Sequence, residues 1–325
     1  MPIVPHSSYR APWWLPGGHA QTIVPALARL VPPVTRHPER IELTDGDFLD
    51  LEWLRNGNKR LVILCHGLEA STRAPYIQGM ARALANRGWD ALAWNYRSCG
   101  GQLNRLPRFY HSGATTDLAA VVSHALDTHP AETVDLVGFS LGGNLVLKYL
   151  GELGTGAVGR IGRAAAFSVP CDLACSSSAL DRPLNRAIYM RRFLVSLAGK
   201  VREKHRQFPE RIDPAGLRGI RNFHDFDERY TAPLHGFRDA RDYWTRSSSK
   251  PFIPAIRVPT LLVNAANDPF LGAACHPRAE AANHPHFHFE MPACGGHVGF
   301  PGPPAAESWP ERRAADFLGG RPPPA

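Results

Sequence analysis

Short apolar runs without polar interruptions recur along most of the chain, separated by segments with helical spacing. Because these runs are continuous rather than alternating, they predict strands that are buried on both faces of a sheet. We expect such strands at residues 60–67, 91–97, 134–140, 163–170, 260–268 and 287–292. Strands of this kind in alternation with helices are typical of a mostly parallel sheet covered by helices. The pattern therefore predicts an α/β fold.

The segments between these runs place apolar residues at the three- and four-residue spacing of a helix. We expect helices at residues 76–87, 114–128, 141–153, 273–282 and 305–318. Ahead of the first buried strand, apolar alternation on both sides of Asp45-Gly46 predicts a β-hairpin. Together these elements predict a core built from residues 39–170 and 251–318.

Residues 171–250 interrupt the alternation of strands and helices. The segment is basic, mostly helical in pattern and without an apolar strand, which predicts a helical cap inserted after the fourth parallel strand. Within it, residues 182–206 mix basic and apolar side chains. Their apolar side could face the interior of the protein, or it could lie on an anionic membrane, and the two interpretations are compatible.

The two ends of the chain lack the pattern of the core. Residues 1–38 are rich in Pro, Trp and Gly, and we expect an extended segment packed on the core. Packing on the core would cover the segment's own apolar side chains, which are Trp13, Trp14, Leu15, Ile23 and Leu27. Residues 319–325 predict a flexible tail.

Composition narrows the range of partners. Lys and Arg number 37 against 29 Asp and Glu, a net charge of +8 that favours anionic surfaces or substrates. The basic residues show no repeated pattern with aromatic ones, so we expect no nucleic-acid partner. The chain starts without a secretory signal and has no apolar run near the roughly 18 residues of a membrane span. We therefore expect a cytoplasmic protein, with peripheral membrane contact left open and the oligomeric state unassigned.

Residues 138–142 form a G-x-S-x-G motif at the point where an apolar strand passes directly into a helix. This is the setting of a nucleophile elbow, a sharp turn that presents a serine hydroxyl. We expect no room for a Cβ atom at Gly138 or Gly142, and Gly143 would let the helix approach the sheet closely. The motif therefore predicts Ser140 as a nucleophile, although a purely structural turn has the same composition.

A serine nucleophile needs a base that removes its proton and a third group that orients the base. On nucleophile-elbow folds the acid and then the histidine follow the serine along the chain. Asp268 ends the strand at 260–268, and His297 lies in a Gly-rich loop after the last strand. We predict a triad of Ser140, Asp268 and His297. Taken alone, Asp268 could be a turn residue before proline, and His297 an ordinary loop histidine.

The negative charge that develops on the substrate needs two backbone N–H donors. Leu141, directly after the nucleophile, is predicted to supply one of them. Leu68 is predicted to supply the other from the loop after the first buried strand, where Gly67 allows a tight turn. The neighbouring His66 is expected to be structural.

The histidines and cysteines of the chain are the remaining candidates for metal ligands. His284, His286 and His288 alternate, so on a strand they would share one face, with Phe287, Phe289 and Met291 buried opposite. We interpret the histidines as an exposed polar face. The six cysteines have neither Cys-x-x-Cys nor zinc-finger spacing. The sequence therefore predicts no metal and no cofactor.

Several longer motifs resemble the YheT-like branch of the α/β-hydrolase superfamily, bacterial relatives of eukaryotic abhydrolase-domain lipases. The resemblance runs from about residue 13 to residue 303, and its motifs are GHAQT, HGLEAST, NYRSCGGQLNRLPRFYHSG, GFSLGGN, FDERYTAPLHGF, NAANDPF and GGHVGF. It implies the α/β-hydrolase fold, a charge-relay triad at Ser140, Asp268 and His297, and activity on esters of short or medium acyl chains, sometimes in lipids. Some members of this branch transfer acyl groups to alcohols.

We therefore predict a carboxylesterase-type serine hydrolase acting on a small-molecule ester. An acyltransferase would share every catalytic residue. A non-catalytic binding protein on the same fold normally lacks a triad member, whereas all three candidates are present here.

Overall fold

The computed structural model describes residues 2–303 and 305–321. Within these residues, nine strands form one sheet in the order β1-β9-β8-β7-β6-β4-β5-β3-β2. All neighbouring strands are parallel except at β3, which runs antiparallel to both β2 and β5. The strands are β1 (Ile3–Val4), β2 (His37–Glu42), β3 (Phe48–Leu54), β4 (Arg60–Cys65), β5 (Trp89–Asn95), β6 (Val134–Phe139), β7 (Ile161–Phe167), β8 (Thr260–Val263) and β9 (Phe287–Glu290). The predicted α/β class, the mostly parallel sheet and the hairpin at Asp45-Gly46 are confirmed.

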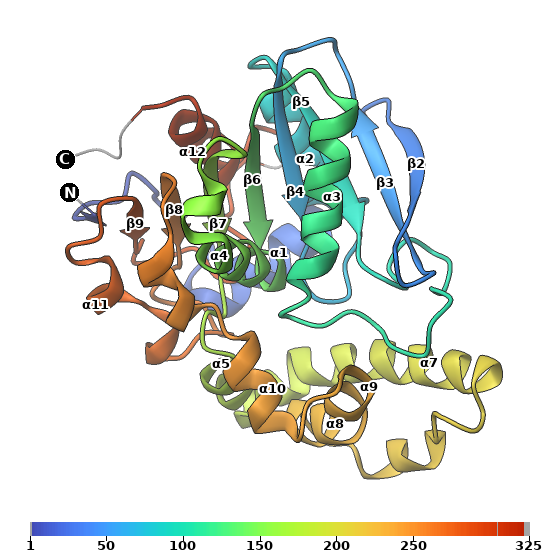
Figure 1. The fold of residues 1–325 in the computed structure, drawn as a ribbon. Helices are drawn as coiled ribbons and strands as arrows, with labels where there is room; N and C mark the ends of the chain where they lie inside the picture. Colours follow the sequence, from blue (N-terminus) through green and yellow to red (C-terminus); the bar gives the residue numbers. More distant parts are fainter. Residues whose placement is uncertain (1, 304, 322–325) are drawn as a thin grey trace.

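Helices cover both faces of the sheet, as Figure 1 shows. On one face, α2 (Pro75–Ala85) and α12 (Trp309–Leu318) bury apolar side chains against the central strands. On the other face, α3 (Thr115–Thr128) and α4 (Leu141–Leu153) do the same. The central strands are buried on both sides, which explains why their sequences are continuously apolar.

Residues 171–250, which we call the cap segment, form helical elements at the carboxyl ends of the parallel strands (Figure 1). The helices are α5 (Leu173–Leu180), α6 (Pro183–Asn185), α7 (Arg191–Gln207), α8 (Phe223–Phe226), α9 (Ala232–His235) and α10 (Ala240–Ser247). Buried apolar side chains of the cap segment form a small cluster, which also includes Phe109 of the core. The predicted domain boundaries at residues 170 and 250 stay a prediction.

Two predicted helices differ from those in the structure. The helix expected at 273–282 is replaced by a single 3-10 turn (Ala273–Cys275) and the short α11 (Arg278–Ala281). Pro277 separates the two pieces, because a proline lacks the N–H that a continuous helix would need there. The last helix, α12, begins at Trp309 rather than at 305. Ser308 and Glu311 form a capping box that determines this start.

The prediction of an extended N-terminal segment is wrong in part. Residues 1–38 contain α1 (Gly17–Ala28), and β1 adds a strand to the edge of the sheet beside β9. Pro25 lies inside α1 and weakens its sequence pattern. Leu15 is buried, but Trp13 is 91% exposed and Trp14 53% exposed, so the expected cover over the tryptophans is absent from the described residues. Of the predicted tail, residues 322–325 lie outside the described residues.

The alternating histidines do not share one face. His284 is buried in the turn before β9, where its Nδ1 accepts the backbone N–H groups of His286 (3.1 Å) and Phe287 (2.9 Å). It therefore organises a turn rather than an exposed strand face, which corrects the prediction for that residue. Among the described residues, no group of three or more His, Cys, Asp or Glu side chains could hold a metal ion.

Candidate active site

Ser140 lies in a strained turn between β6 and α4. Its backbone has φ 52° and ψ −120°, a conformation that non-glycine residues seldom adopt. The Ser140 N–H donates to the carbonyl oxygen of Phe167 at 2.9 Å, which ties the turn to β7. The turn therefore has the geometry of a nucleophile elbow.

Three glycines around Ser140 lie where a side chain would not fit. A Cβ atom at Gly138 would lie 2.4 Å from the carbonyl oxygen of Gly142. One at Gly142 would lie 2.3 Å from the carbonyl oxygen of Cys65, and one at Gly143 would lie 2.5 Å from Cγ2 of Val169. These distances are all well below van der Waals contact, so α4 can approach β4, β6 and β7 this closely only with glycine at these positions.

The structure brings together the three residues proposed from their order in the sequence. Nε2 of His297 lies 2.9 Å from Oγ of Ser140. Nδ1 of His297 lies 2.9 Å from Oδ2 and 3.1 Å from Oδ1 of Asp268. The ring of Phe270 stacks on the imidazole with a centroid distance of 3.9 Å. The imidazole is therefore held between a carboxylate and a hydroxyl, as a general base acting on Ser140 would be.

The loop that carries His297 is held by side chains from the N-terminal segment. Thr22 accepts the backbone N–H of His297 at 2.8 Å, and the side-chain oxygen of Gln21 accepts that of Gly295 at 2.9 Å. Asn267 donates to the same Gln21 oxygen and accepts the N–H of Gly296. The sequence pattern around Gln21 and Thr22 predicts no such role for them. The signal that points to these residues is the GHAQT motif that contains them.

The loop after β4 places Leu68 beside the nucleophile. A Cβ atom on Gly67 would lie only 3.3 Å from Cβ of Ser140, so this loop passes very close to the elbow. The N–H groups on either side of Leu68 are bound, that of Gly67 by the hydroxyl of Tyr76 and that of Glu69 by the hydroxyl of Tyr110, both at 2.9 Å.

Two backbone N–H groups beside Ser140 have no acceptor in the described part of the chain. Leu68 N–H is one, and Leu141 N–H, at the first position of α4, is the other. The first N–H groups of a helix have no partner within the helix. Both residues line one cavity together with Ser140 and His297. Leu68 and Leu141 are therefore placed as candidate donors to an oxyanion.

His66 is buried and takes no part in this arrangement. Its Nδ1 lies 2.8 Å from the carbonyl oxygen of Gly67, and its Nε2 accepts the backbone N–H of Tyr96. Burial lowers the pKa of the imidazole to about 3, so the ring is neutral and braces the loop.

A cavity that is partly open to solvent lies between Ser140 and the cap segment. Most of its wall is apolar and comes from the cap segment and from the loop around Phe270. These apolar residues are Leu173, Leu180, Phe193, Leu197, Phe223, Phe226, Trp244 and Phe270. An apolar space directly over the nucleophile suits a hydrocarbon chain.

One buried carboxyl group also lines the cavity. Asp227 accepts hydrogen bonds from the Thr231 hydroxyl (2.6 Å) and the Trp244 indole (2.8 Å). Burial raises the pKa of Asp227 to about 6 in spite of these two bonds.

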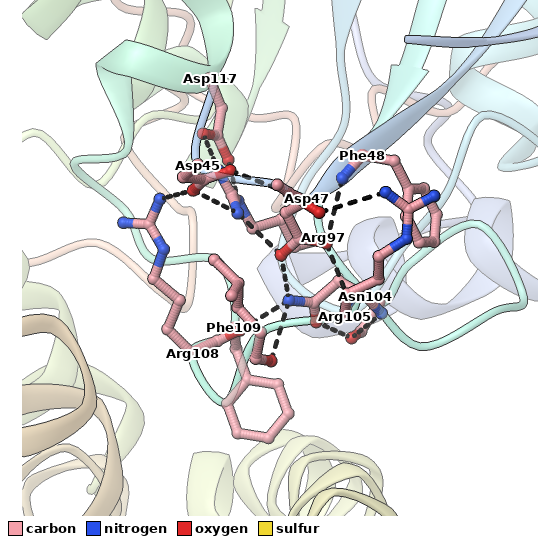
Figure 2. Close-up of polar contacts among 12 residues, drawn as sticks. Asp45, Asp47, Phe48, Arg97, Asn104, Arg105, Arg108, Phe109 and Asp117 are labelled. Atoms are coloured by element: carbon pink, nitrogen blue, oxygen red, sulfur yellow. Dashed lines mark hydrogen bonds and ion pairs between the residues drawn. The ribbon is translucent and has the colours of Figure 1, made fainter. Parts of the chain in front are cut away.

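A buried ionic network supports the loop that forms one wall of the cavity. Figure 2 shows Arg97 among carboxylates from two other segments. Its guanidinium lies 2.8 Å from Asp47 and, through two nitrogens, 2.8 Å from both oxygens of Asp117. Asn104 donates to Asp47 at 2.6 Å and to the carbonyl oxygen of Arg108 at 2.9 Å. The network therefore fixes the course of the loop just before the cavity-lining residues 109–112.

Comparison with known proteins places this site in a family. Residues 60–166 match the family described as alpha/beta hydrolase fold. YheT of Escherichia coli (strain K12), provisionally named an esterase, is 33% identical over 308 residues, which cover 92% of this chain and 89% of YheT. Phospholipase ABHD3 of Mus musculus is 30% identical over 309 residues, covering 92% of this chain and 74% of the mouse protein. The solved esterase Pf2001 of Pyrococcus furiosus shares the fold, with a TM-score of 0.58 at 18% identity over 90% of this chain and 98% of that one.

The fold and these relatives define a hydrolase of the esterase and lipase type. Within that class, the chain belongs to the YheT-like family of the α/β-hydrolase superfamily. The resemblance predicted from the sequence motifs is confirmed, as is the prediction of a carboxylesterase-type enzyme.

Proposed function

We propose that the protein hydrolyses carboxylic esters of short- to medium-chain acyl groups through an acyl-enzyme on Ser140. In the first half of the reaction, His297 takes the proton of Ser140 as Oγ attacks the ester carbonyl carbon. The N–H groups of Leu68 and Leu141 bind the resulting oxyanion. The C–O bond to the alcohol then breaks, and the proton on His297 passes to the departing alcohol oxygen.

In the second half, water takes the place of the alcohol. His297 removes a proton from this water as its oxygen attacks the acyl carbon, and the same two N–H groups bind the second oxyanion. The bond from the acyl carbon to Oγ breaks, the proton returns to Ser140, and the acid leaves. Asp268 keeps the Nδ1–H tautomer of His297 and stabilises its charged form throughout.

The observation that carries this proposal is the unbroken hydrogen-bond relay from Ser140 through His297 to Asp268. Ser140 and His297 of this relay line the apolar cavity. A serine with a purely structural role in a turn does not require a hydrogen bond to an imidazole that is itself bound by a buried carboxylate. The apolar wall supports an acyl chain as the part of the substrate that enters.

Removing the hydroxyl of Ser140 tests the proposal directly. We expect Ser140→Ala to lower kcat on p-nitrophenyl butyrate by about 10⁴-fold or more, because no acyl-enzyme can form. The variant should also resist labelling by a fluorophosphonate probe, which modifies the wild type. Ser178→Ala is the matched control, because Ser178 is an exposed serine of α5 outside the cavity. Wild-type activity in Ser140→Ala would refute the assignment.

An acyltransferase would use the same residues and differ only in what attacks the acyl-enzyme. Adding a short alcohol to the assay and measuring the ratio of free acid to new ester separates the two activities. A predominance of free acid at all alcohol concentrations supports hydrolysis, and a predominance of new ester supports transfer.

We also propose a peripheral contact between the cap segment and an anionic lipid surface. Three large apolar side chains there are exposed, namely Leu184 (56%), Ile188 (36%) and Val195 (65%). Exposed arginines flank them, at 182, 186, 191 and 192. Apolar side chains beside cationic ones favour the interface of an anionic bilayer. Among the described residues, no helix is both long enough and apolar enough to cross a bilayer, so this contact would be peripheral.

Sedimentation with lipid vesicles tests this contact. We expect binding to phosphatidylglycerol vesicles that weakens with added salt, and less binding to phosphatidylcholine. Leu184→Glu should reduce the binding, whereas Val158→Glu, a similarly exposed site (64%) outside the cap segment, should not. Equal binding by both variants would count against the cap segment as the contact surface.

A further inference from the structure

Glu69, next to the oxyanion donor Leu68, has a backbone conformation that needs support. Its φ is 52°, in the left-handed region that non-glycine residues seldom occupy. Such conformations persist only where surrounding contacts hold them, and they gather at functional sites. The conformation of Glu69 therefore depends on contacts from neighbouring segments.

Tyr110 binds Glu69 from the core. Its hydroxyl accepts the backbone N–H of Glu69 at 2.9 Å and lies 2.8 Å from the Oε1 atom of the same residue. This pair of contacts links the backbone and the side chain of Glu69 to one hydroxyl group.

Helix α7 of the cap segment binds the same carboxylate. Nζ of Lys200 lies 2.7 Å from Oε1, and the hydroxyl of Ser196 donates to Oε2. Ser196 and Lys200 are four residues apart, so they lie on one face of α7. The Glu69 side chain is only 4% exposed and that of Lys200 17% exposed. This contact is therefore a largely buried bridge between the cap segment and the oxyanion loop.

The bridge favours the charged form of the lysine. Burial opposes the charge of Lys200, but Cys99 and Glu69 outweigh it, and the pKa of Lys200 lies above its usual value. Lys200 also lines the cavity together with Leu68. Neither Glu69 nor Lys200 is hydrogen-bonded to the catalytic groups, since Ser140 and His297 bond to each other and His297 bonds to Asp268.

We propose that Glu69 and Lys200 are positioning residues that couple the docking of α7 to the geometry of the oxyanion hole. The inference rests on the proposed hydrolysis at Ser140. With the bridge in place, Glu69 keeps its left-handed backbone and Leu68 N–H points into the cavity. Without it, Glu69 relaxes toward a commoner conformation and Leu68 N–H turns away from the oxyanion.

The test compares catalysis with the affinity of a compound that needs the oxyanion hole. An alkyl trifluoromethyl ketone forms an anionic adduct with a serine nucleophile, so its Ki reports the donors directly. For Lys200→Met we expect kcat on p-nitrophenyl acetate to fall by about 10- to 100-fold. This loss is smaller than the roughly 10²- to 10³-fold fall in kcat that follows the complete removal of one oxyanion donor. The Ki of the ketone should rise by a similar factor while KM changes little, and Lys200→Arg should restore both.

Lys204→Met is the matched control. Lys204 lies one turn further along α7 and is fully buried, and it donates to the carbonyl oxygens of Asn104 and Leu106 rather than to Glu69. Its removal also loosens a contact between α7 and the core, so it should lower the Tm. The Ki of the ketone should nevertheless stay near that of the wild type.

If Lys200→Met does not fold, Glu69→Gln provides the same comparison with an uncharged side chain of the same shape. Unchanged kcat and Ki in Lys200→Met, or in Glu69→Gln, would overturn the proposed coupling. So would a parallel loss in Lys204→Met. A wild type that neither binds the ketone nor reacts with a fluorophosphonate would instead refute the proposed function, so the two failures are distinguishable.

Discussion

Oγ of Ser140 and Nε2 of His297 lie 2.9 Å apart, although 157 positions separate the two residues in the chain. The serine is held by the strained turn between β6 and α4, and the histidine by a loop after β9. Neither segment could place its side chain without the sheet between them.

Asp268→Asn should leave the fold intact and lower kcat by about 10⁴-fold. Asp268 accepts from His297 Nδ1 and also from the backbone N–H of Phe270 at 2.8 Å. An asparagine can keep the second bond, but its NH₂ group would turn the imidazole toward the wrong tautomer. Steady-state rates with an ester, together with the Tm, test this. A loss of less than about tenfold would contradict the assigned role.

Gly142→Ala should destabilise the protein by at least about 2 kcal/mol, because its Cβ would lie 2.3 Å and 2.5 Å from two backbone carbonyl oxygens. Gly156→Ala is the matched control, since a Cβ there meets nothing within 4 Å. We expect the control to stay within about 0.5 kcal/mol of wild type. Urea unfolding of both variants measures the difference, and similar stabilities would rule out the steric argument.

Arg97→Met should lower the free energy of unfolding by about 3–5 kcal/mol, because it leaves the carboxylates of Asp47 and Asp117 buried without their cation (Figure 2). Arg40→Met offers a comparison at the surface, where Arg40 is 36% exposed beside Asp50. An exposed ion pair of that kind contributes at most about 1 kcal/mol. Denaturation midpoints of the two variants should therefore differ clearly. Equal losses would argue against a special contribution from the buried network.

Asp227→Asn should stabilise the protein at pH 8 by an amount of the order of 1–3 kcal/mol. Burial raises the pKa of Asp227 from 3.8 to about 6. Between these two values the unfolded chain loses the proton and the folded chain keeps it. The wild type therefore loses stability as the pH rises from about 4 to about 6, and the loss is constant above that range. An asparagine avoids this cost, since its oxygen can accept the Trp244 N–H and its NH₂ group can donate to the Thr231 hydroxyl oxygen. The gain should therefore fade toward pH 4.

Unfolding free energies at pH 4, 6 and 8 measure this dependence. Asp127→Asn, at an exposed position of α3, should show no comparable gain at pH 8. A stabilisation of Asp227→Asn that is the same at all three pH values would mean that ionisation is not its cause.

The elements that the sequence predicts well are those determined by local pattern. Residues 141–153 form the expected helix with unchanged limits, and the buried strands lie within a few residues of their predicted positions. The helix expected at 273–282 fails, because Pro277 outweighs an apolar spacing that by itself suits a helix. The sequence does not predict helix α1 for a related reason, since Pro25 and the nearby glycines obscure the helical spacing of its apolar residues.

The sequence by itself determined the class of fold, the elbow at Ser140 and the chain order of the candidate acid and base. Each of these depends on residues close together in the chain, or on an order that the fold imposes. Only the tertiary structure decided that Thr22 holds the backbone of His297, 275 positions away, and that Lys200 reaches Glu69 across 131 positions. Such contacts have no local pattern, because they exist only after the sheet has brought distant segments to one edge.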